Sequence, residues 1–264
     1  MRYACGIEYD GYGFLGFQSQ VQQPTIQDCL EKAISQVANH NIRIHCAGRT
    51  DTGVSATAQV IHFDTDSERS EYQWIMGVNA NLPDGISILW LKEVEDDFHA
   101  RFSAIQRSYR YVILNRWIRP ALNRHSVTWE KLPLDAEKMN QAAQCLQGTH
   151  DFNAFRSSVC QSKVSVKTIN EIKVYRDGNQ VIMDVAANGF LHHMIRNIIG
   201  TLLPIGRGEM PIQHIKQVLE SKDRTQAGIT APPNGLSFNV VKYPEKYQLP
   251  ESSIENHLPK HYDR

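Results

Sequence analysis

The first half of the chain combines a strand-like alternation of hydrophobic and polar positions with stretches of helical spacing. Four segments have the apolar pattern of strands, namely residues 2–9, 42–46, 60–63 and 86–94. Two segments have apolar residues at helical spacing, namely residues 26–37 and 74–78. Thr25 is the expected N-cap of the first helix, and Asp28 makes a variant of the capping box. The order strand, helix, strand, strand, helix, strand predicts a ferredoxin-like antiparallel sheet with both helices on one face.

The second half partly repeats this order. Its predicted strands are residues 108–115, 169–175, 181–187 and 236–243, and its predicted helices are residues 136–146, 194–202 and 212–219. Asp177 and Gly178 form a strong hairpin signal between two of these strands. No sequence repeat is visible, so the duplication is inferred from the order of elements alone.

We therefore predict an α+β fold of two ferredoxin-like (RRM-like) halves, with antiparallel sheets flanked by helices and an active-site cleft between the halves. An acidic stretch ends the first half and a basic stretch begins the second, which places the boundary near residues 102–107. The predicted domains are residues 1–104 and 105–264, and the polar residues from 244 onward are expected to dock loosely.

Composition narrows the class of protein. Hydrophobic residues make up 41% of the 264 positions, which is enough for a core, and no apolar run is long enough to cross a bilayer. Residues 1–5 alternate like a strand and lack the apolar stretch of a signal peptide, so we expect a soluble, cytoplasmic protein. The five cysteines are scattered without a Cys-x-x-Cys pair, which favours reduced thiols over disulfides or a zinc site.

Charge is distributed unevenly, although the formal net charge is zero. The stretch from Phe98 to Trp129 has six arginines and no Asp or Glu; the arginines are Arg101, Arg107, Arg110, Arg116, Arg119 and Arg124. Such a stretch is typical of a localised phosphate-binding surface. The alternative is a solvated face whose arginines pair with acids distant in sequence.

A polar loop between two predicted strands contains the first candidate for chemistry. In residues 47–56, Asp51 is flanked by glycines, and Arg49 is close enough to pair with it or to bind a phosphate. The simpler interpretation is an ordinary Asx turn. Asp-Thr-Gly also occurs in aspartic proteases, but that mechanism needs two carboxylates, and the chain has one such motif together with strong helical stripes.

Three further segments contain candidate functional residues. In residues 106–112 tyrosines alternate with arginines, which suits base stacking and phosphate binding but also a strand with tyrosines in the core. In residues 189–197, Arg196 lies near the start of an apolar helix and is expected to have an anionic partner or to reach solvent. Adjacent His192 and His193 are expected to point to different faces of that helix, so they do not suit a shared metal. Residues 9–18 are rich in glycine but lack the spacing of a nucleotide-binding loop.

Together these segments resemble the tRNA pseudouridine synthase A (TruA) family. The matching stretches are GIEYDGYGFLGFQSQ (6–20), CAGRTDTGVSA (46–56), FHARFSA (98–104), RSYRYVI (107–113) and FLHHMIRNIIG (190–200). They follow the family's order and extend over nearly the whole chain. One departure is Ser55, where the family pattern usually has histidine.

The resemblance implies an isomerase that detaches a uridine at N1–C1′, turns it over and rejoins it through C5, with no cofactor and no metal. It implies action on the tRNA anticodon stem–loop, at positions 38–40, by a homodimer. Asp51 matches the family's catalytic aspartate, and Tyr109 matches its substrate-binding tyrosine. Arg49 is expected to help extrude the base, and Arg196 to pair with Asp51 and keep it ionised.

Two other functions stay open on the residues alone. A non-catalytic RNA-binding module on ferredoxin-like sheets would explain the aromatic and arginine-rich segments, although the RNP-type aromatic motif is missing. An aspartic hydrolase acting on peptides would use the Asp-Thr-Gly loop. The helix at Met194–Leu203 is a candidate dimer contact or, more simply, a core helix.

Overall fold

The computed structural model describes residues 1–20, 24–160, 162 and 164–250, which form two compact units. The first unit comprises residues 1–105 and 238–250, and the second comprises residues 106–237. None of the helices in these described ranges has the length and apolar character needed to span a membrane.

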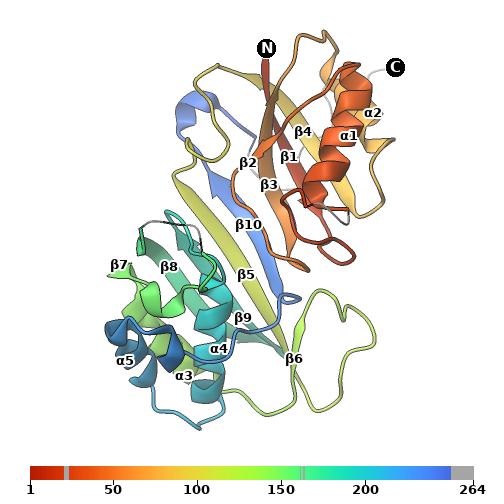
Figure 1. The fold of residues 1–264 in the computed structure, drawn as a ribbon. Helices are drawn as coiled ribbons and strands as arrows, with labels where there is room; N and C mark the ends of the chain where they lie inside the picture. The colour runs from red at the N-terminus through yellow and green to blue at the C-terminus, as the bar shows by residue number, and fades with distance from the viewer. Residues whose placement is uncertain (21–23, 161, 163, 251–264) are drawn as a thin grey trace. The chain divides into compact units, whose positions relative to one another are not determined.

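A mostly antiparallel sheet forms the core of the first unit (Figure 1). Its strands are β1 (Arg2–Tyr9), β2 (His45–Cys46), β3 (Ser55–Asp64), β4 (Ile86–Val94) and most of β10 (Leu236–Lys242). The strand order is β4-β1-β3-β10, and β2 also pairs with β3. Cys5 in the central β1 is opposite Ile61 on one side and Leu91 on the other, and all three side chains are buried. The continuous burial of β1 follows from this central position.

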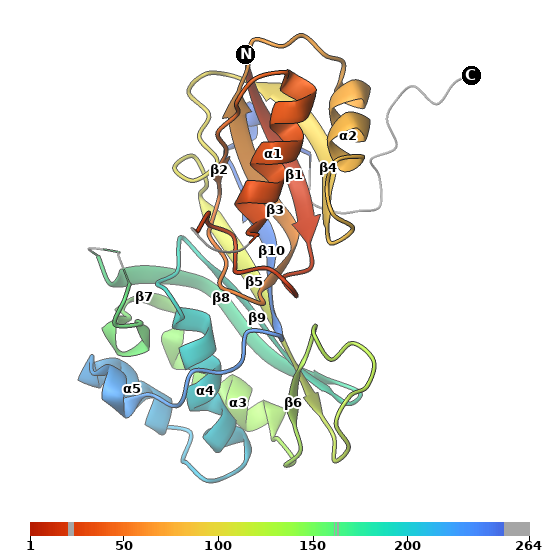
Figure 2. The ribbon, with the colours of Figure 1, turned by 45° about the vertical axis from the view of Figure 1, so that its right-hand side comes forward.

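Helices α1 (Ile26–Ala38) and α2 (Glu71–Asn79) lie side by side on one face of this sheet (Figure 2). The predicted cap of α1 is confirmed, because the Thr25 hydroxyl accepts a hydrogen bond from the backbone N–H of Asp28. The Asp28 carboxylate in turn accepts from the Thr25 hydroxyl over 2.7 Å. The predicted face is thus covered by two helices, as expected for an α+β unit.

The sheet strands of the second unit follow the order β5-β9-β8-β7. Its strands are β5 (Gln106–Asn115), β6 (Thr128–Glu130), β7 (Gly148–Asp151), β8 (Val166–Asp177) and β9 (Gln180–Ala187). The neighbours in this order are antiparallel, and β6 pairs with β5 in parallel. The predicted hairpin between β8 and β9 is confirmed, and Gly178 adopts the positive φ of +53° that its turn needs.

Three α-helices accompany this sheet: α3 (Ala136–Ala143), α4 (Met194–Gly206) and α5 (His214–Ser221). Ten of the thirteen residues of α4 are buried, so this helix is a core element. Four short 3₁₀ helices complete the described structure, namely Gln144–Leu146, Asn153–Phe155, Arg224–Gln226 and Glu245–Tyr247.

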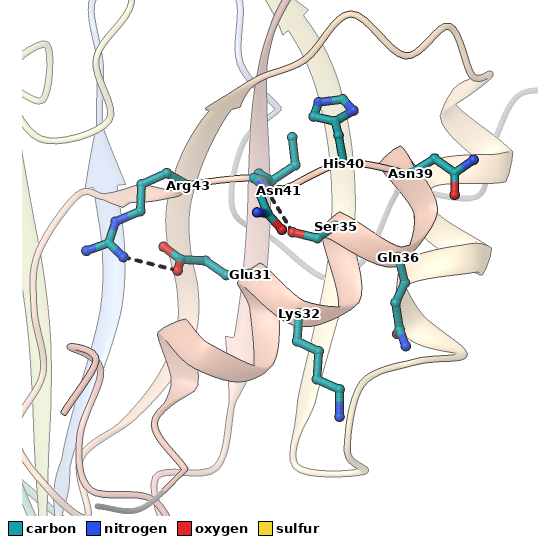
Figure 3. A pocket seen from close by; sticks show the side chains of 9 residues that line it. Glu31, Lys32, Ser35, Gln36, Asn39, His40, Asn41 and Arg43 are labelled. Carbon is teal, nitrogen blue, oxygen red and sulfur yellow. Dashed lines mark hydrogen bonds and ion pairs between the residues drawn. The ribbon is translucent and has the colours of Figure 1, made fainter. Parts of the chain in front are cut away.

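The α+β class is confirmed, and the differences from the predicted elements have local causes. The strand predicted over residues 42–46 is reduced to His45–Cys46, because the backbone N–H groups of Ile42 and Ile44 donate to the side chains of Ser35 and Glu31 on α1. Figure 3 shows these polar groups lining a surface hollow of about 760 Å³, in which Arg43 and Glu31 form an ion pair of 3.3 Å. Strands β6 and β7 were not predicted, since each is too short for a periodicity to register.

The division into ferredoxin-like halves stays a prediction. Strand β10 was assigned to the second predicted domain, whereas residues 238–242 pack with the first unit, where β10 pairs with β3. Residues 244–250, expected to dock loosely, are also in the first unit, where the Lys92 ammonium donates to the Tyr247 carbonyl over 3.2 Å. Chain order alone does not reveal such a return, since it depends on pairing between distant strands.

Candidate active site

The loop that contains Asp51, residues 47–54, is held by buried polar groups of the first unit. Thr50 is 7% exposed, and its hydroxyl forms a 2.8 Å hydrogen bond with the hydroxyl of Tyr9 at the end of β1. The Thr50 carbonyl also accepts the backbone N–H of Phe17 over 3.0 Å. Burial raises the pKa of Tyr9, so its phenol stays protonated and keeps this hydrogen bond at neutral pH. The residue preceding Asp51 is therefore fixed from the interior.

The start of the same loop is fixed by β3. Gln59 is fully buried, and its side-chain amide donates to the Gly48 carbonyl over 2.6 Å. The backbone N–H of Ala47 donates to the Val60 carbonyl over 2.8 Å. The buried Gln59 amide cannot exchange its protein partner for water, so these hydrogen bonds hold the start of the loop in one conformation.

Two glycines of the segment 10–17 pack directly against the Asp51 loop. A Cβ atom on Gly11 would lie 2.4 Å from the Val54 carbonyl oxygen, and one on Gly16 would lie 2.9 Å from the Thr50 carbonyl oxygen. Gly16 also has a φ of +76°. These glycines therefore allow the backbone of segment 10–17 to pack closely against the backbone of the Asp51 loop.

Asp51 itself is half-buried and begins a tight turn. Its carbonyl accepts the backbone N–H of Val54 over 3.1 Å, and Gly53 has a φ of +78° inside the turn. The chain therefore makes a backbone turn at Asp51. Arg49 is exposed and, in the part of the chain that the structure describes, makes no ion pair, so the alternative of an Arg49–Asp51 pair is not observed.

Ser55 stands where the family pattern has histidine, and it has a defined local role. Its hydroxyl accepts the backbone N–H of Gly11 over 3.0 Å and donates to the Asp10 carboxylate over 3.4 Å. Asp10 also accepts the backbone N–H of Tyr12 over 3.0 Å. The substitution thus ties the segment 10–12 to the end of the Asp51 loop.

In the second unit, Tyr109 lies on β5 with its ring edge-on to Phe190, at a centroid distance of 5.1 Å. Tyr111, two residues on, is fully buried, and its hydroxyl interacts with the Thr128 hydroxyl at 2.6 Å and the Pro232 carbonyl at 2.7 Å. The core interpretation of this strand holds for Tyr111, whereas Tyr109 is only half-buried and its proposed role in base stacking stays a prediction.

The arginines of the basic stretch differ in their surroundings. Arg110 forms a two-pronged ion pair with Asp184, its direct cross-strand neighbour on β9, with N–O distances of 2.7 and 2.9 Å. Hydrogen bonding to this carboxylate raises the pKa of Arg110 further. This pair of residues 74 positions apart matches the alternative of arginines that pair with distant acids. Arg110 is therefore a sheet residue, and a phosphate surface must come from other arginines.

Arg196 lies in the first turn of α4 and is half-buried. Its Nε donates to the Ala231 carbonyl over 2.8 Å, and the Ala231 backbone N–H donates to the Arg196 carbonyl over 3.1 Å. His193, just before the helix, has a φ of +63°, an unusual conformation for a non-glycine residue. The helix therefore begins after the two histidines, and their rings lie 3.9 Å apart instead of on different helix faces as expected.

Asn197, next to Arg196, was not among the predicted site residues, yet it organises this region. It has no exposed surface, and its amide nitrogen donates to the Phe155 carbonyl over 2.8 Å. Its amide oxygen accepts from Arg224 over 3.0 Å and from the Thr230 hydroxyl over 2.7 Å. An asparagine inside the strongest apolar stripe of the sequence was the available signal, because a buried amide requires such partners.

Asp51 and Arg49 thus share one loop of the first unit, while Tyr109 and Arg196 belong to the second. The similarity of the chain to known proteins identifies the class of enzyme to which these residues belong. The family model described as tRNA pseudouridine synthase matches residues 6–103 and 142–244. The chain belongs to the tRNA pseudouridine synthase family, which confirms the family predicted from the five motif stretches and the prediction of an isomerase.

Its similar curated relatives bear the name tRNA pseudouridine synthase A. The protein of Shewanella sp. strain W3-18-1 is 53% identical over 96% of this chain and 97% of its own length. That of Shewanella baltica strain OS185 is 52% identical over the same shares. Among solved structures, a chain of a Cbf5-Nop10-Gar1 complex matches at 15% identity with a TM-score of 0.35, covering 76% of this chain and 45% of that one.

Proposed function

We propose that this chain converts uridine to pseudouridine at positions 38–40 in the anticodon stem–loop of tRNA, with Asp51 as the catalytic nucleophile. The observation that carries the proposal is the Asp51 loop: a half-buried carboxylate between Thr50 and Gly53, whose backbone is fixed by buried Tyr9 and Gln59. A preorganised carboxylate suits a reaction in which a glycosidic bond breaks at an electron-poor carbon.

The reaction needs no redox partner. The electron pair of the N1–C1′ bond leaves with the base, the base turns over, C5 bonds to C1′, and the proton on C5 departs. A carboxylate can form a transient bond with the sugar or the base, or remove a sugar proton, and each route keeps Asp51 at the centre. The observed fixation of the loop contributes by limiting the motion of this carboxylate.

The other site residues are assigned by the same family match. Tyr109, half-buried and edge-on to Phe190, is proposed to stack on the target ring and to help the C5 proton leave. Exposed Arg49 is proposed to assist extrusion of the base from its stem. Arg196, oriented by the Ala231 carbonyl, is proposed to be the cationic partner that keeps Asp51 ionised.

We also propose that the two halves are ferredoxin-like, that the protein works as a cytoplasmic homodimer, and that residues of both units serve one substrate. In the first unit, the strand order β4-β1-β3 and the two helices on one face of the sheet support the ferredoxin-like assignment. The names of the Shewanella relatives support the tRNA substrate.

The test is tritium release from full-length unmodified tRNA labelled at uridine C5, in buffer containing EDTA. Wild-type protein is expected to release tritium into water, because C5 becomes bonded to the sugar. Asp51→Asn keeps the shape of the side chain and is expected to abolish release while tRNA affinity stays within about twofold. A loss of at least 10³-fold is the scale expected for an essential group.

Asp66→Asn is the matched control, since Asp66 is an exposed acid of the same unit. It should behave like the wild type in both assays. Turnover by Asp51→Asn at the wild-type rate would exclude the carboxylate as the nucleophile. Binding of tRNA by the wild type without any release would instead support the RNA-binding module.

A further inference from the structure

The connection between β5 and β6, residues 116–127, is a long loop of the second unit that extends away from the strands in both views (Figures 1 and 2). It contains three arginines of the basic stretch, Arg116, Arg119 and Arg124, and no acidic residue. All three are exposed. Within the ranges that the structure describes, none of them forms an ion pair, in contrast to Arg110 on the adjacent strand.

The loop also exposes large apolar side chains. Trp117 is 73% exposed, Ile118 is 64% exposed and Leu122 is 85% exposed. Isolated exposed apolar residues are ordinary, but here three of them fall within six positions of a segment that also contains three exposed arginines. An accessible indole beside guanidinium groups offers a stacking platform together with phosphate donors.

The loop is nevertheless held in place. Pro120 is buried in its middle. At its base, the indole N–H of Trp129 donates to the Arg116 carbonyl over 2.8 Å. At its far end, Asn123 has a φ of +56° and its carbonyl accepts the Ser126 backbone N–H over 3.0 Å. A tethered loop loses less entropy when a partner binds than a disordered one.

We propose that loop 116–127 is an RNA-contacting surface that binds the phosphate backbone of the substrate tRNA through Arg119 and Arg124 and stacks Trp117 on an exposed base. The inference rests on the proposed function for the identity of the RNA. A protein of zero net charge needs a local basic surface to hold a polyanion, and this loop supplies arginines without an ion-pair partner among the described residues, unlike Arg110.

Charge argues against the main alternative occupant, a second copy of this loop. In a two-fold contact each loop meets itself, so the arginines of one copy would face those of the other. Like charges at such a contact are unfavourable, and the loop has no carboxylate to offset them. RNA satisfies both the arginines and the exposed aromatic ring.

The experiment measures tRNA affinity of the full chain as a function of salt, using an unmodified full-length tRNA transcript. Arg119→Gln/Arg124→Gln is expected to weaken binding by about tenfold at low salt and to reduce the slope of log Kd against log salt by about one for each arginine. Trp117→Ala is expected to weaken binding by about fivefold or more with little change in slope, because stacking is not ionic.

Lys138→Gln/Lys216→Gln is the matched control. It removes the same charge from exposed positions on α3 and α5 of the same unit, and it should leave affinity and slope near those of the wild type. Equal slopes for the loop variant and this control would overturn the proposal. So would loop variants that retain affinity but change the sedimentation of the protein, which would assign the loop to self-association.

Tritium release by the wild type separates the two hypotheses. If the wild type releases tritium and the loop variants bind tRNA normally, only the loop proposal fails. If the wild type releases no tritium, the proposed function fails. The salt dependence of tRNA binding by the loop variants still tests whether the loop contacts RNA.

Discussion

The side-chain oxygen of Asn197 accepts a hydrogen bond of 2.7 Å from the hydroxyl of Thr230, at a position in α4 with no exposure to solvent. This contact brings the segment 224–231 across the helix that contains Arg196. The same segment supplies the Ala231 carbonyl that orients the Arg196 side chain. A buried amide thus connects the packing of the second unit to the position of a proposed site residue.

Replacing Asn197 by Ala should lower the free energy of unfolding by about 2–3 kcal/mol, because the Phe155 carbonyl and the Thr230 hydroxyl would lose a buried partner. Urea denaturation of the full chain measures the change. Asn170→Ala is the control, since Asn170 is exposed, and its cost should stay below about 0.5 kcal/mol. Equal costs for the two variants would show that the buried network contributes no special stability.

Gly200 in the middle of α4 should not tolerate a methyl group. Its Cβ would lie 1.8 Å from the Ile229 carbonyl oxygen, a backbone atom that cannot rotate away. Gly200→Ala is therefore expected to destabilise the protein by about 1–3 kcal/mol despite the higher helix propensity of alanine. In Gly189→Ala the nearest atom is a flexible lysine carbon at 4.0 Å, so its melting temperature should stay near that of the wild type. A thermal shift assay that finds Gly200→Ala as stable as Gly189→Ala would contradict this packing.

The buried Tyr9–Thr50 hydrogen bond should couple the core to catalysis. Tyr9→Phe and Thr50→Val each remove one partner, and each is expected to reduce kcat several-fold because the residue before Asp51 gains freedom. The double variant should be less impaired than the sum of the two, with a coupling of about 1 kcal/mol. Strictly additive effects on kcat, from the tritium assay at saturating tRNA, would show that the bond does not position the loop.

His62 should make the first unit sensitive to acid. Burial, followed by the neighbouring His99 and His45, lowers the pKa of His62 to about 3, and its Nδ1 accepts the Ala100 backbone N–H over 3.1 Å. The folded state therefore binds this proton less readily than the unfolded state, in which the pKa is about 6.5. Stability is present above about pH 6.5 and is lost progressively as the pH falls from there toward 3, by about 2 kcal/mol at pH 5.

Urea denaturation between pH 7 and pH 4 measures this dependence. His62→Gln should flatten it, since an amide can occupy the site without titrating. His214→Gln, at a half-exposed position of the second unit, is the control and should leave it in place. A profile as steep in His62→Gln as in the wild type would assign the acid sensitivity to other groups.

Local patterns predicted the elements whose stabilising contacts are themselves local. Strands β1 and β4 match the predicted residues 2–9 and 86–94, and α1 begins after Thr25 as its cap predicted. The strand over 42–46 was mostly wrong because side chains of α1 take its backbone N–H groups. Such competition between a side chain and a strand partner is decided by tertiary contacts and leaves no periodic signal.

The sequence by itself determined the family, and it predicted Asp51 as the catalytic residue, because a short motif keeps its residues together along the chain. Only the tertiary structure showed how that loop is held: Tyr9 and Thr50 are 41 positions apart, and Asn197 and Thr230 are 33 positions apart. It also separated Arg110, paired with Asp184, from the arginines of loop 116–127, which have no such partner among the described residues. A hydrogen bond or an ion pair depends on distance in space, and a linear pattern records only distance along the chain.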